Sequence, residues 1–309
     1  MKNQRVHILT SWWCTNDCIF CMDDKTLRNF ISLEKCKKNL LDWLKYSKEV
    51  TFTSWEPTIH PKIVEMVKMA KELWYETIQI ISNWRKYKDI NFVLDLINAW
   101  VTDFIISIHW YNSLLHDSIV RKQWVFNDVL KWLVNISKLK KKYNLVFNTN
   151  TTIIRQNYKY TYKIVYFLEK FPIDSIVLNV VIPQQEALKN KNEILVKYSL
   201  MAEEFKKLVI LQNKFNNIYI NWFPYCLWKE LDSLIWFREP VEFEQDWVNI
   251  ARHSDNHDLD VKWDIELKII NWKLKREECK QCIYFNNCEW IWESYINIYW
   301  WQEFNPIIK

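Results

Sequence analysis

The chain of 309 residues contains 20 tryptophans and no glycine. Glycine normally makes up about 7% of a protein, which predicts roughly 20 glycines in a chain of this length. Glycine is the residue that most readily adopts positive φ, so a chain without it must place bulkier residues at its tight turns and helix ends. This absence constrains the fold more than any other feature of the sequence.

Several tryptophans stand where glycine is expected. Trp74 and Trp100 directly follow the helical runs EMVKMAKEL and NFVLDLINA. That is the C′ position of a helix, where positive φ is common. The dipeptide Asn271-Trp272 separates IELKII from KLKRE, where Asn-Gly would form a type I′ hairpin turn. A bulky indole is among the worst side chains for such positions.

We therefore predict that most of the tryptophans replace glycine, as in a gene that uses UGA for glycine and is translated with UGA as tryptophan. The alternative is a protein that is genuinely rich in tryptophan. Trp292 and Trp301 are our candidates for authentic tryptophan. The positions at which we expect glycine in the native protein are Trp12, Trp13, Trp55, Trp84, Trp110 and Trp290.

Charge and hydropathy exclude some classes of protein. The net charge is +5, and the densest basic stretch, KLKKKY at 138–143, fits a solvated helix end, so nothing specific favours a nucleic-acid partner. MKNQRVHIL leads directly into a strand-like run, and no apolar stretch approaches the roughly 18 residues that span a bilayer. We expect a cytoplasmic chain without a membrane partner, in which eight cysteines indicate metal binding or catalysis rather than disulfides.

Short β-branched or aromatic runs alternate with helical patterns over the first two-thirds of the chain. Apolar strands that alternate with helices predict a parallel sheet covered by helices, closed into a partial (β/α)6 barrel. Polar residues gather at the strand ends, where ligands bind in such folds. The expected strands are residues 5–11, 49–54, 77–83, 103–109, 145–154 and 175–183, and the expected helices are residues 33–46, 61–73, 88–99, 124–142, 157–170 and 197–215.

The regular alternation of expected strands and helices ends after residue 216. Residues 218–226 form one more expected strand, residues 227–262 are irregular and charged, and a hairpin at 265–276 precedes a group of cysteines. We therefore divide the chain into a core domain, 1–216, and a smaller cysteine-rich C-terminal module, 217–309.

The sequence CTNDCIFC places Cys14, Cys18 and Cys21 just past the first expected strand. Three thiolates in one loop can hold three corners of a [4Fe–4S] cube and leave the fourth iron open. A structural zinc site would need a fourth ligand nearby. The C-x3-C-x2-C spacing, with the aromatic Phe20 before the last cysteine, resembles the signature of the radical S-adenosylmethionine (SAM) family. The resemblance implies that the open iron binds SAM.

The resemblance extends along most of the chain and implies a SAM pocket. Ser54-Trp55-Glu56-Pro57 is similar to the family's Gly-Gly-Glu-Pro segment, which contacts the SAM amino group. Ser82-Asn83-Trp84 is similar to the Thr/Ser-Asn-Gly end of the third strand, near the SAM ribose and carboxylate. Ordinary strand-end capping is the alternative for each single residue. The implied SAM-binding positions are Phe20, Ser54, Trp55, Glu56, Ser82, Asn83, Ser107, His109, Asn148, Asn150 and Ile182.

A second cysteine site combines Cys226 with Cys279, Cys282 and Cys288. Four thiolates suit either zinc or a fully ligated [4Fe–4S] cluster. The C-x2-C-x5-C element resembles the auxiliary-cluster modules called SPASM and twitch, which implies one auxiliary [4Fe–4S] cluster. Cys36 lies in a helical pattern and is expected to be a free thiol.

The resemblance implies an enzyme that reductively cleaves SAM to a 5′-deoxyadenosyl radical and abstracts hydrogen from a substrate. A peptide or protein substrate is favoured over a small molecule, with ferredoxin or flavodoxin as the reductant. One alternative is the related group that rearranges GTP in molybdenum-cofactor synthesis, but its Gly-Gly tail is absent from EFNPIIK. A two-cluster electron-transfer protein and a zinc-stabilised binding protein are alternatives from other classes.

Overall fold

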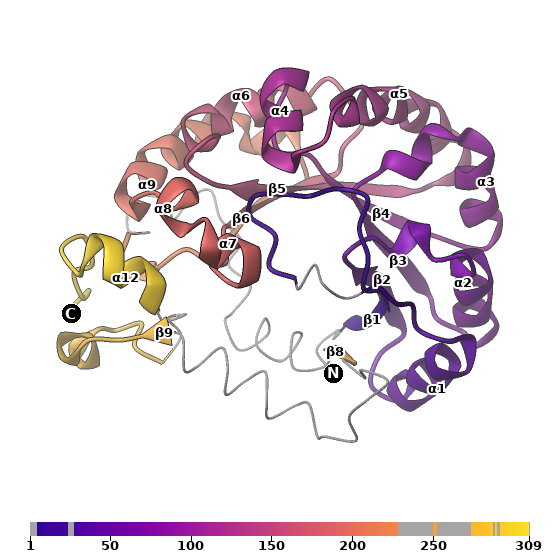
Figure 1. Ribbon diagram of the computed structural model, residues 1–309, viewed down its shortest axis with the longest axis horizontal. Coiled ribbons are helices and arrows are strands. Elements are labelled where there is room, and N and C mark those ends of the chain that lie inside the picture. The colour runs from indigo at the N-terminus through magenta and orange to yellow at the C-terminus, as the bar shows by residue number, and fades with distance from the viewer. Residues whose placement is uncertain are drawn as a thin grey trace.

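The computed structural model describes residues 5–23, 28–227, 250–251, 273–286, 288 and 291–308. Its main feature is a curved parallel sheet with helices along the convex side (Figure 1). The strand order is β7-β6-β5-β4-β3-β2-β1-β8, so β1 to β7 follow one another in chain order across the sheet. Figure 1 shows the open barrel that this order produces, which confirms the expected α/β fold.

Every strand pairing in this sheet is parallel. The carboxyl ends of the strands therefore meet at one rim, and the first cysteine loop leaves the sheet there. The strands are β1 (Arg5–Ser11), β2 (Glu49–Ser54), β3 (Thr77–Ser82), β4 (Asp103–Ser107), β5 (Val146–Ile153), β6 (Ser175–Val180), β7 (Asn217–Asn221) and β8 (Ile250–Ala251).

The longer helices between these strands, such as α1, α2, α3 and α5, are amphipathic and bury one face. In α1, Ser32 caps the first turn by accepting a hydrogen bond from the Lys35 N–H at 3.2 Å. The helices of the barrel are α1 (Leu33–Leu44), α2 (Ile63–Glu72), α3 (Ile90–Asn98), α4 (Ser113–Val120), α5 (Val125–Tyr143), α6 (Thr161–Leu168), α7 (Gln185–Lys189), α8 (Lys191–Ile194) and α9 (Tyr198–Lys206).

The two faces of the sheet differ in polarity. Along β5, Phe147 and Ile153 are buried in the core shared with the helices, whereas Asn148, Asn150 and Thr152 are only half-buried. Successive side chains of a strand point to opposite faces, so the half-buried set lines the inner, concave face. A closed barrel of this type is normally filled by Val, Ile and Leu, and the polar lining here favours a lumen that holds a polar ligand.

The six expected strands are confirmed within a few residues of their expected ends. The further strand expected at 218–226 is β7, which ends earlier, at Asn221, pairs with β6 and extends the parallel order. The sequence pattern missed α4, α7 and α8 because these helices are short and interrupt expected loops. The division of the chain at residue 216 stays a prediction.

The C-terminal part packs against the barrel through α12 (Glu293–Tyr299). The Tyr198 N–H at the start of α9 donates to the Tyr295 hydroxyl at 2.9 Å, and Tyr295 in turn donates to Glu303. Arg155 donates to the Tyr299 hydroxyl at 2.7 Å. A short antiparallel pair, β9 (Lys273–Leu274) with β10 (Ile291–Trp292), precedes α12. The Asn271-Trp272 turn, the rest of the hairpin expected at 265–276, and Trp290 lie outside the described residues.

Tryptophan dominates the positions that favour glycine. Ten described non-glycine residues have positive φ, and six of them are tryptophan, including Trp74 (φ 67°) and Trp100 (φ 91°), as expected for C′ positions. Trp84 also has positive φ, but Trp12, Trp13, Trp55 and Trp110, where we also expect glycine, do not. The remaining tryptophans with positive φ are Trp124, Trp222 and Trp300.

Several buried indoles also fit their surroundings poorly. The Nε1 atoms of Trp43, Trp84, Trp110 and Trp132 are buried without a hydrogen-bond partner in the part of the chain that the structure describes. Each such donor costs about 1–3 kcal/mol. Glycine at these positions has no side-chain donor to satisfy. The replacement of glycine by tryptophan remains a prediction, and the backbone angles together with these unpaired donors support it.

Candidate active site

Cys14, Cys18 and Cys21 lie in the loop that follows β1 at the carboxyl rim of the sheet. Backbone hydrogen bonds hold this loop on both sides. The Ile19 N–H donates to the Ile119 carbonyl of α4 at 3.0 Å, and the Ala187 N–H of α7 donates to the Cys21 carbonyl at 3.0 Å. The missed helices α4 and α7 therefore fix the cysteine loop in place.

Phe20 joins this loop to the end of β4. Its ring lies edge-on to the His109 ring, with 4.6 Å between ring centroids. His109 Nδ1 accepts a hydrogen bond from the Thr152 N–H at 3.2 Å, which assigns the ring proton of the neutral imidazole to Nε2. Burial, and next the charge of His116, hold the pKa of His109 well below its ordinary value, so His109 is neutral. It acts here as a packing partner for the cysteine loop.

Asn83, the first residue after β3, contacts the cysteine loop directly. Its Nδ2 donates to Cys14 Sγ at 3.2 Å and to Thr15 Oγ1 at 3.0 Å. The next residue but one, Arg85, donates from Nη1 to the Thr15 carbonyl at 2.8 Å. These contacts tie the first cysteine to the end of the third strand.

Glu56 is completely buried and accepts several hydrogen bonds. The Thr58 N–H and the Ser82 hydroxyl donate to Oε1 at 3.0 and 2.8 Å, and the Thr58 hydroxyl donates to the same oxygen. The Asn83 N–H donates to Oε2 at 2.7 Å. Asn83, which follows β3, thus links Glu56 after β2 to Cys14 in the loop after β1.

The electrostatics of this site call for a cation. Burial raises the pKa of Glu56, and the hydrogen bonds that stabilise its carboxylate only partly offset this. Burial, and next the charge of Glu56, raise the pKa of Cys14 to about 12. A carboxylate and a thiolate side by side are costly without a positive group between or beside them. Iron and the ammonium group of an amino acid are such groups, so this donor set fits a cluster with a bound amino acid.

The other expected SAM-pocket residues lie at or near the same rim. Ser54 ends β2 with φ 98°, and half-buried Trp55 follows it. Ser107 ends β4 and is paired in register with Asn150 of β5. The half-buried residues Ile182 and Asn148 complete the set.

Asn148 lies deeper than expected from the sequence. It is the third of the eight residues of β5, because that strand continues to Ile153. Its Oδ1 is buried without a hydrogen-bond partner among the described residues. Asn148 therefore lines the lumen below the rim.

Sequence reasoning missed Thr58 and Arg85. The contact with Thr58 could have been predicted from the sequence. Glu56 stands at an N-cap position, and a carboxylate there accepts a hydrogen bond from the backbone N–H two residues later, which is that of Thr58. No spacing in the sequence indicated the contact between Arg85 and Thr15, which depends on how the cysteine loop folds back over β3.

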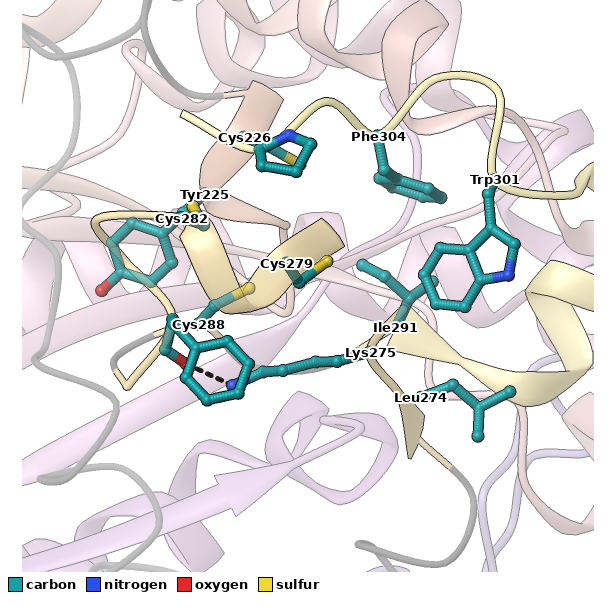
Figure 2. Close-up of a pocket in the computed structure, with 12 residues that line it drawn as sticks. Tyr225, Cys226, Leu274, Lys275, Cys279, Cys282, Cys288, Ile291, Trp301 and Phe304 are labelled. Carbon is teal, nitrogen blue, oxygen red and sulfur yellow. Dashed lines mark hydrogen bonds between the residues drawn. The ribbon is translucent and has the colours of Figure 1, made fainter. Parts of the chain in front are cut away.

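The four remaining metal-ligand candidates gather in a second pocket (Figure 2). Cys226 follows β7, whereas Cys279, Cys282 and Cys288 come from the segment before β10, and Tyr225, Phe285, Trp301 and Phe304 are among the other residues that line the pocket. The sequence grouped these four cysteines, and the fold brings them together from positions more than 50 residues apart. Cys36 is buried in α1 and lines neither site.

The four thiols of this pocket interact electrostatically. Burial, and next the charges of Cys288, Cys279 and Cys282, raise the pKa of Cys226 to about 12. Burial raises the pKa of Cys288 to about 11, and the nearby Lys275 ammonium partly opposes the shift. Four thiolates cannot all form here without a cation among them, which is what a metal or cluster supplies.

No group of three or more His, Cys, Asp or Glu among the described residues is placed to hold a single metal ion. A [4Fe–4S] cluster makes a different demand, since each thiolate binds a different iron. The donor sets of the two cysteine sites, three thiols in the first and four in the second, fit that demand. Within the described chain, no helix is long and apolar enough to cross a membrane.

A model of the radical SAM superfamily matches residues 8–168, which is more than half of the chain. The chain belongs to the radical SAM superfamily. Membership makes it an enzyme and implies SAM and a [4Fe–4S] cluster as its cofactors, for which Cys14, Cys18 and Cys21 are the fitting ligands. No curated protein sequence matches this chain at a significant level.

Solved structures of radical SAM enzymes share the fold. Streptococcus suis SuiB bound to its precursor peptide SuiA aligns with a TM-score of 0.64 and 17% identity over 93% of this chain and 71% of SuiB. SuiB bound to S-adenosylmethionine aligns with a TM-score of 0.63 and 16% identity over 93% of this chain and 72% of SuiB. The enzyme anSMEcpe, bound to SAM and the Kp18Cys peptide, aligns with a TM-score of 0.61 and 12% identity over 97% of this chain and 95% of that one.

Proposed function

We propose that this radical SAM enzyme modifies a peptide or protein substrate by abstracting a hydrogen atom from it. When bound and reduced, the cluster would supply one electron for cleavage of the sulfur–C5′ bond of SAM to methionine and a 5′-deoxyadenosyl radical, which would take a hydrogen atom from the substrate to give 5′-deoxyadenosine and a substrate radical. The electron comes from a one-electron donor such as ferredoxin or flavodoxin. The observation that carries the proposal is the contact of Asn83 with both Cys14 and Glu56.

Cys14, Cys18 and Cys21 would hold the cluster, and Asn83 would fix the first of these ligands. A donor that contacts a ligating sulfur orients it and tunes the bound metal. Glu56 would pair with the methionyl ammonium group of SAM, because its carboxylate is buried, held by four donors and forms no ion pair within the described part of the chain. Phe20 and His109 would keep the loop and its cluster at the rim.

The second pocket would hold one auxiliary [4Fe–4S] cluster through Cys226, Cys279, Cys282 and Cys288. The raised pKa values of Cys226 and Cys288 support a bound cation here, and a set of four thiolates suits a fully ligated [4Fe–4S] cluster, with zinc as the alternative. This cluster would bind the substrate or accept an electron from a product radical.

A peptide substrate is supported by two features. The lumen is polar on β5, with Asn148, Asn150 and Thr152 half-buried. Two structures of similar fold, SuiB with SuiA and anSMEcpe with Kp18Cys, hold peptides.

Transfer of deuterium tests this proposal. The anaerobically reconstituted enzyme, SAM and dithionite are incubated with a fully deuterated tryptic peptide mixture from a bacterial lysate, or with a deuterated peptide encoded beside the gene. We expect 5′-deoxyadenosine that carries one deuterium, measured by mass spectrometry. SAM cleavage without any deuterium transfer from either source would contradict a peptide substrate.

A further inference from the structure

Three asparagine side chains form a continuous hydrogen-bonded ladder across β5, β6 and β7. Asn221 Nδ2 donates to Asn179 Oδ1 at 2.8 Å, and Asn179 Nδ2 donates to Asn150 Oδ1 at 2.8 Å. Asn179 and Asn221 are paired in register. Asn150 lies on β5 and pairs with Val177, two residues before Asn179. We call these three side chains the amide ladder.

The amide ladder faces the lumen of the barrel. Asn150, Asn179 and Asn221 are each half-buried, and they alternate with fully buried neighbours such as Leu178 and Ile220. Those neighbours belong to the core beneath the helices. Because successive strand residues point to opposite faces, the ladder amides point inward.

The ladder has a direction. Both of its bonds run from β7 towards β5, so each amide donates to the next one along. Among the described residues, nothing accepts a hydrogen bond from Asn150 Nδ2, and nothing donates to Asn221 Oδ1. Hydrogen bonds in a chain polarise one another, which strengthens the donor at one end and the acceptor at the other.

The ends of the ladder lie towards the two cysteine sites. Asn150 pairs in register with Ser107, and the Ile108 N–H donates to the Asn150 carbonyl at 2.9 Å, beside His109 and the first cysteine loop. Asn221 ends β7, and Cys226 of the second pocket follows five residues later. A molecule lying along the ladder would therefore extend from the first site towards the second.

We propose that the amide ladder binds the backbone of an extended peptide. Asn150, which the family resemblance placed in the SAM pocket, is assigned here to the peptide instead: its Nδ2 donates to a peptide carbonyl, and Asn221 Oδ1 accepts from a peptide N–H. β5 and β7 are two strand spacings apart, about 10 Å. An extended peptide covers this distance with about three residues. The inference deepens the proposed function, because it rests on a peptide entering this lumen.

The chemistry of the ladder selects this class of ligand. A phosphate or carboxylate offers acceptors only and would satisfy the Asn150 end alone. A peptide repeats one donor and one acceptor per residue, so a single orientation of its chain satisfies both ends. No side chain of the substrate is needed for this contact.

The test uses two labelled probes that differ at alternate residues, where N-methylation replaces the backbone N–H in the second probe. The first is a fluorescein-labelled (Ala-Gly)3 amide, and the second is (Ala-Sar)3, in which N-methylglycine replaces glycine. Fluorescence anisotropy is measured with the reconstituted enzyme and SAM. We expect (Ala-Gly)3 to bind about tenfold more tightly than (Ala-Sar)3. This difference in affinity corresponds to one or two hydrogen bonds.

Two variants test whether the preference for (Ala-Gly)3 over (Ala-Sar)3 arises at the amide ladder. Asn221→Leu removes the acceptor at the end of the ladder, and we expect the tenfold preference to fall to about one. Asn217→Leu is the matched control, since Asn217 is a half-buried residue at the opposite end of β7 with no part in the ladder, and it keeps the preference. Equal binding of both probes by the unchanged enzyme, no binding of either, or a preference that survives Asn221→Leu would overturn the inference. SAM cleavage is measured alongside, so failure of the proposed function is seen separately.

Discussion

The tryptophans at positive φ allow a direct test of whether the backbone at these positions favours glycine. Trp74, Trp124 and Trp300 have φ of 67°, 68° and 56° and are 77%, 70% and 68% exposed. Trp300 has ψ of −168°, a region that is essentially restricted to glycine. If these positions suit glycine, replacing each tryptophan by glycine should stabilise the protein more than replacing it by alanine does.

The expected difference follows from two opposing costs. A residue with Cβ costs about 1–2 kcal/mol in the left-handed region. Glycine costs about 0.5–1 kcal/mol in extra unfolded-state entropy. Comparing glycine with alanine at the same site cancels the lost indole contacts, so glycine should be favoured by about 1 kcal/mol per site. The three sites are independent, which gives about 3 kcal/mol for the triple variant.

The assay is unfolding in guanidinium chloride, followed by far-UV circular dichroism, with the triple glycine and triple alanine variants side by side. Trp13 is the control for backbone conformation: glycine is expected there in the native protein, but Trp13 is 42% exposed and not at positive φ, so alanine should be favoured in stability by about 0.5–1 kcal/mol. A triple glycine variant no more stable than the triple alanine variant would refute the backbone argument. UGG codons at these positions in the gene would separately refute the proposed decoding.

Cys282→Ala should leave SAM binding intact but slow substrate turnover at least tenfold; an unchanged rate would leave the auxiliary site a structural role only. Burial raises the pKa of Glu56, and a protonated carboxyl cannot pair with an ammonium group, so SAM affinity should rise as the pH rises through that pKa. Glu56→Gln should weaken SAM binding and flatten its pH dependence, measured by equilibrium dialysis; an unchanged pH profile would contradict the pairing. Asn83→Leu removes the donor to Cys14 Sγ and should speed iron loss to a chelator about tenfold, whereas equal rates would contradict its role.

Much of the fold was predictable because its signals are local. Each expected strand is a short β-branched run, and the helices between them repeat apolar residues at helical spacing. The helix α7 escaped detection because it spans only five residues, fewer than a periodic pattern needs, and α4, with eight residues, lies in a stretch that was expected to be a loop. Their importance lies in tertiary contacts with the cysteine loop, which no local pattern encodes.

Part of the candidate site was likewise predictable from local sequence, and the rest depends on tertiary contacts. The three cysteines of the loop and the Glu56 segment were predictable from spacing. The contact of Asn83 with Cys14 joins residues 69 positions apart and depends on the pairing of neighbouring strands. Asn179 and Asn221 carried no motif at all, because the amide ladder arises only when β5, β6 and β7 lie side by side.

The central claim is that Cys14, Cys18 and Cys21 hold a cluster that cleaves SAM. Anaerobic reconstitution with iron and sulfide, followed by dithionite reduction in the presence of SAM, tests it most directly. We expect about eight irons per chain, four for each cluster, together with 5′-deoxyadenosine. Cys18→Ala should keep about four irons and form no 5′-deoxyadenosine. Zinc in place of iron at both sites, or SAM cleavage that survives Cys18→Ala, would contradict the account.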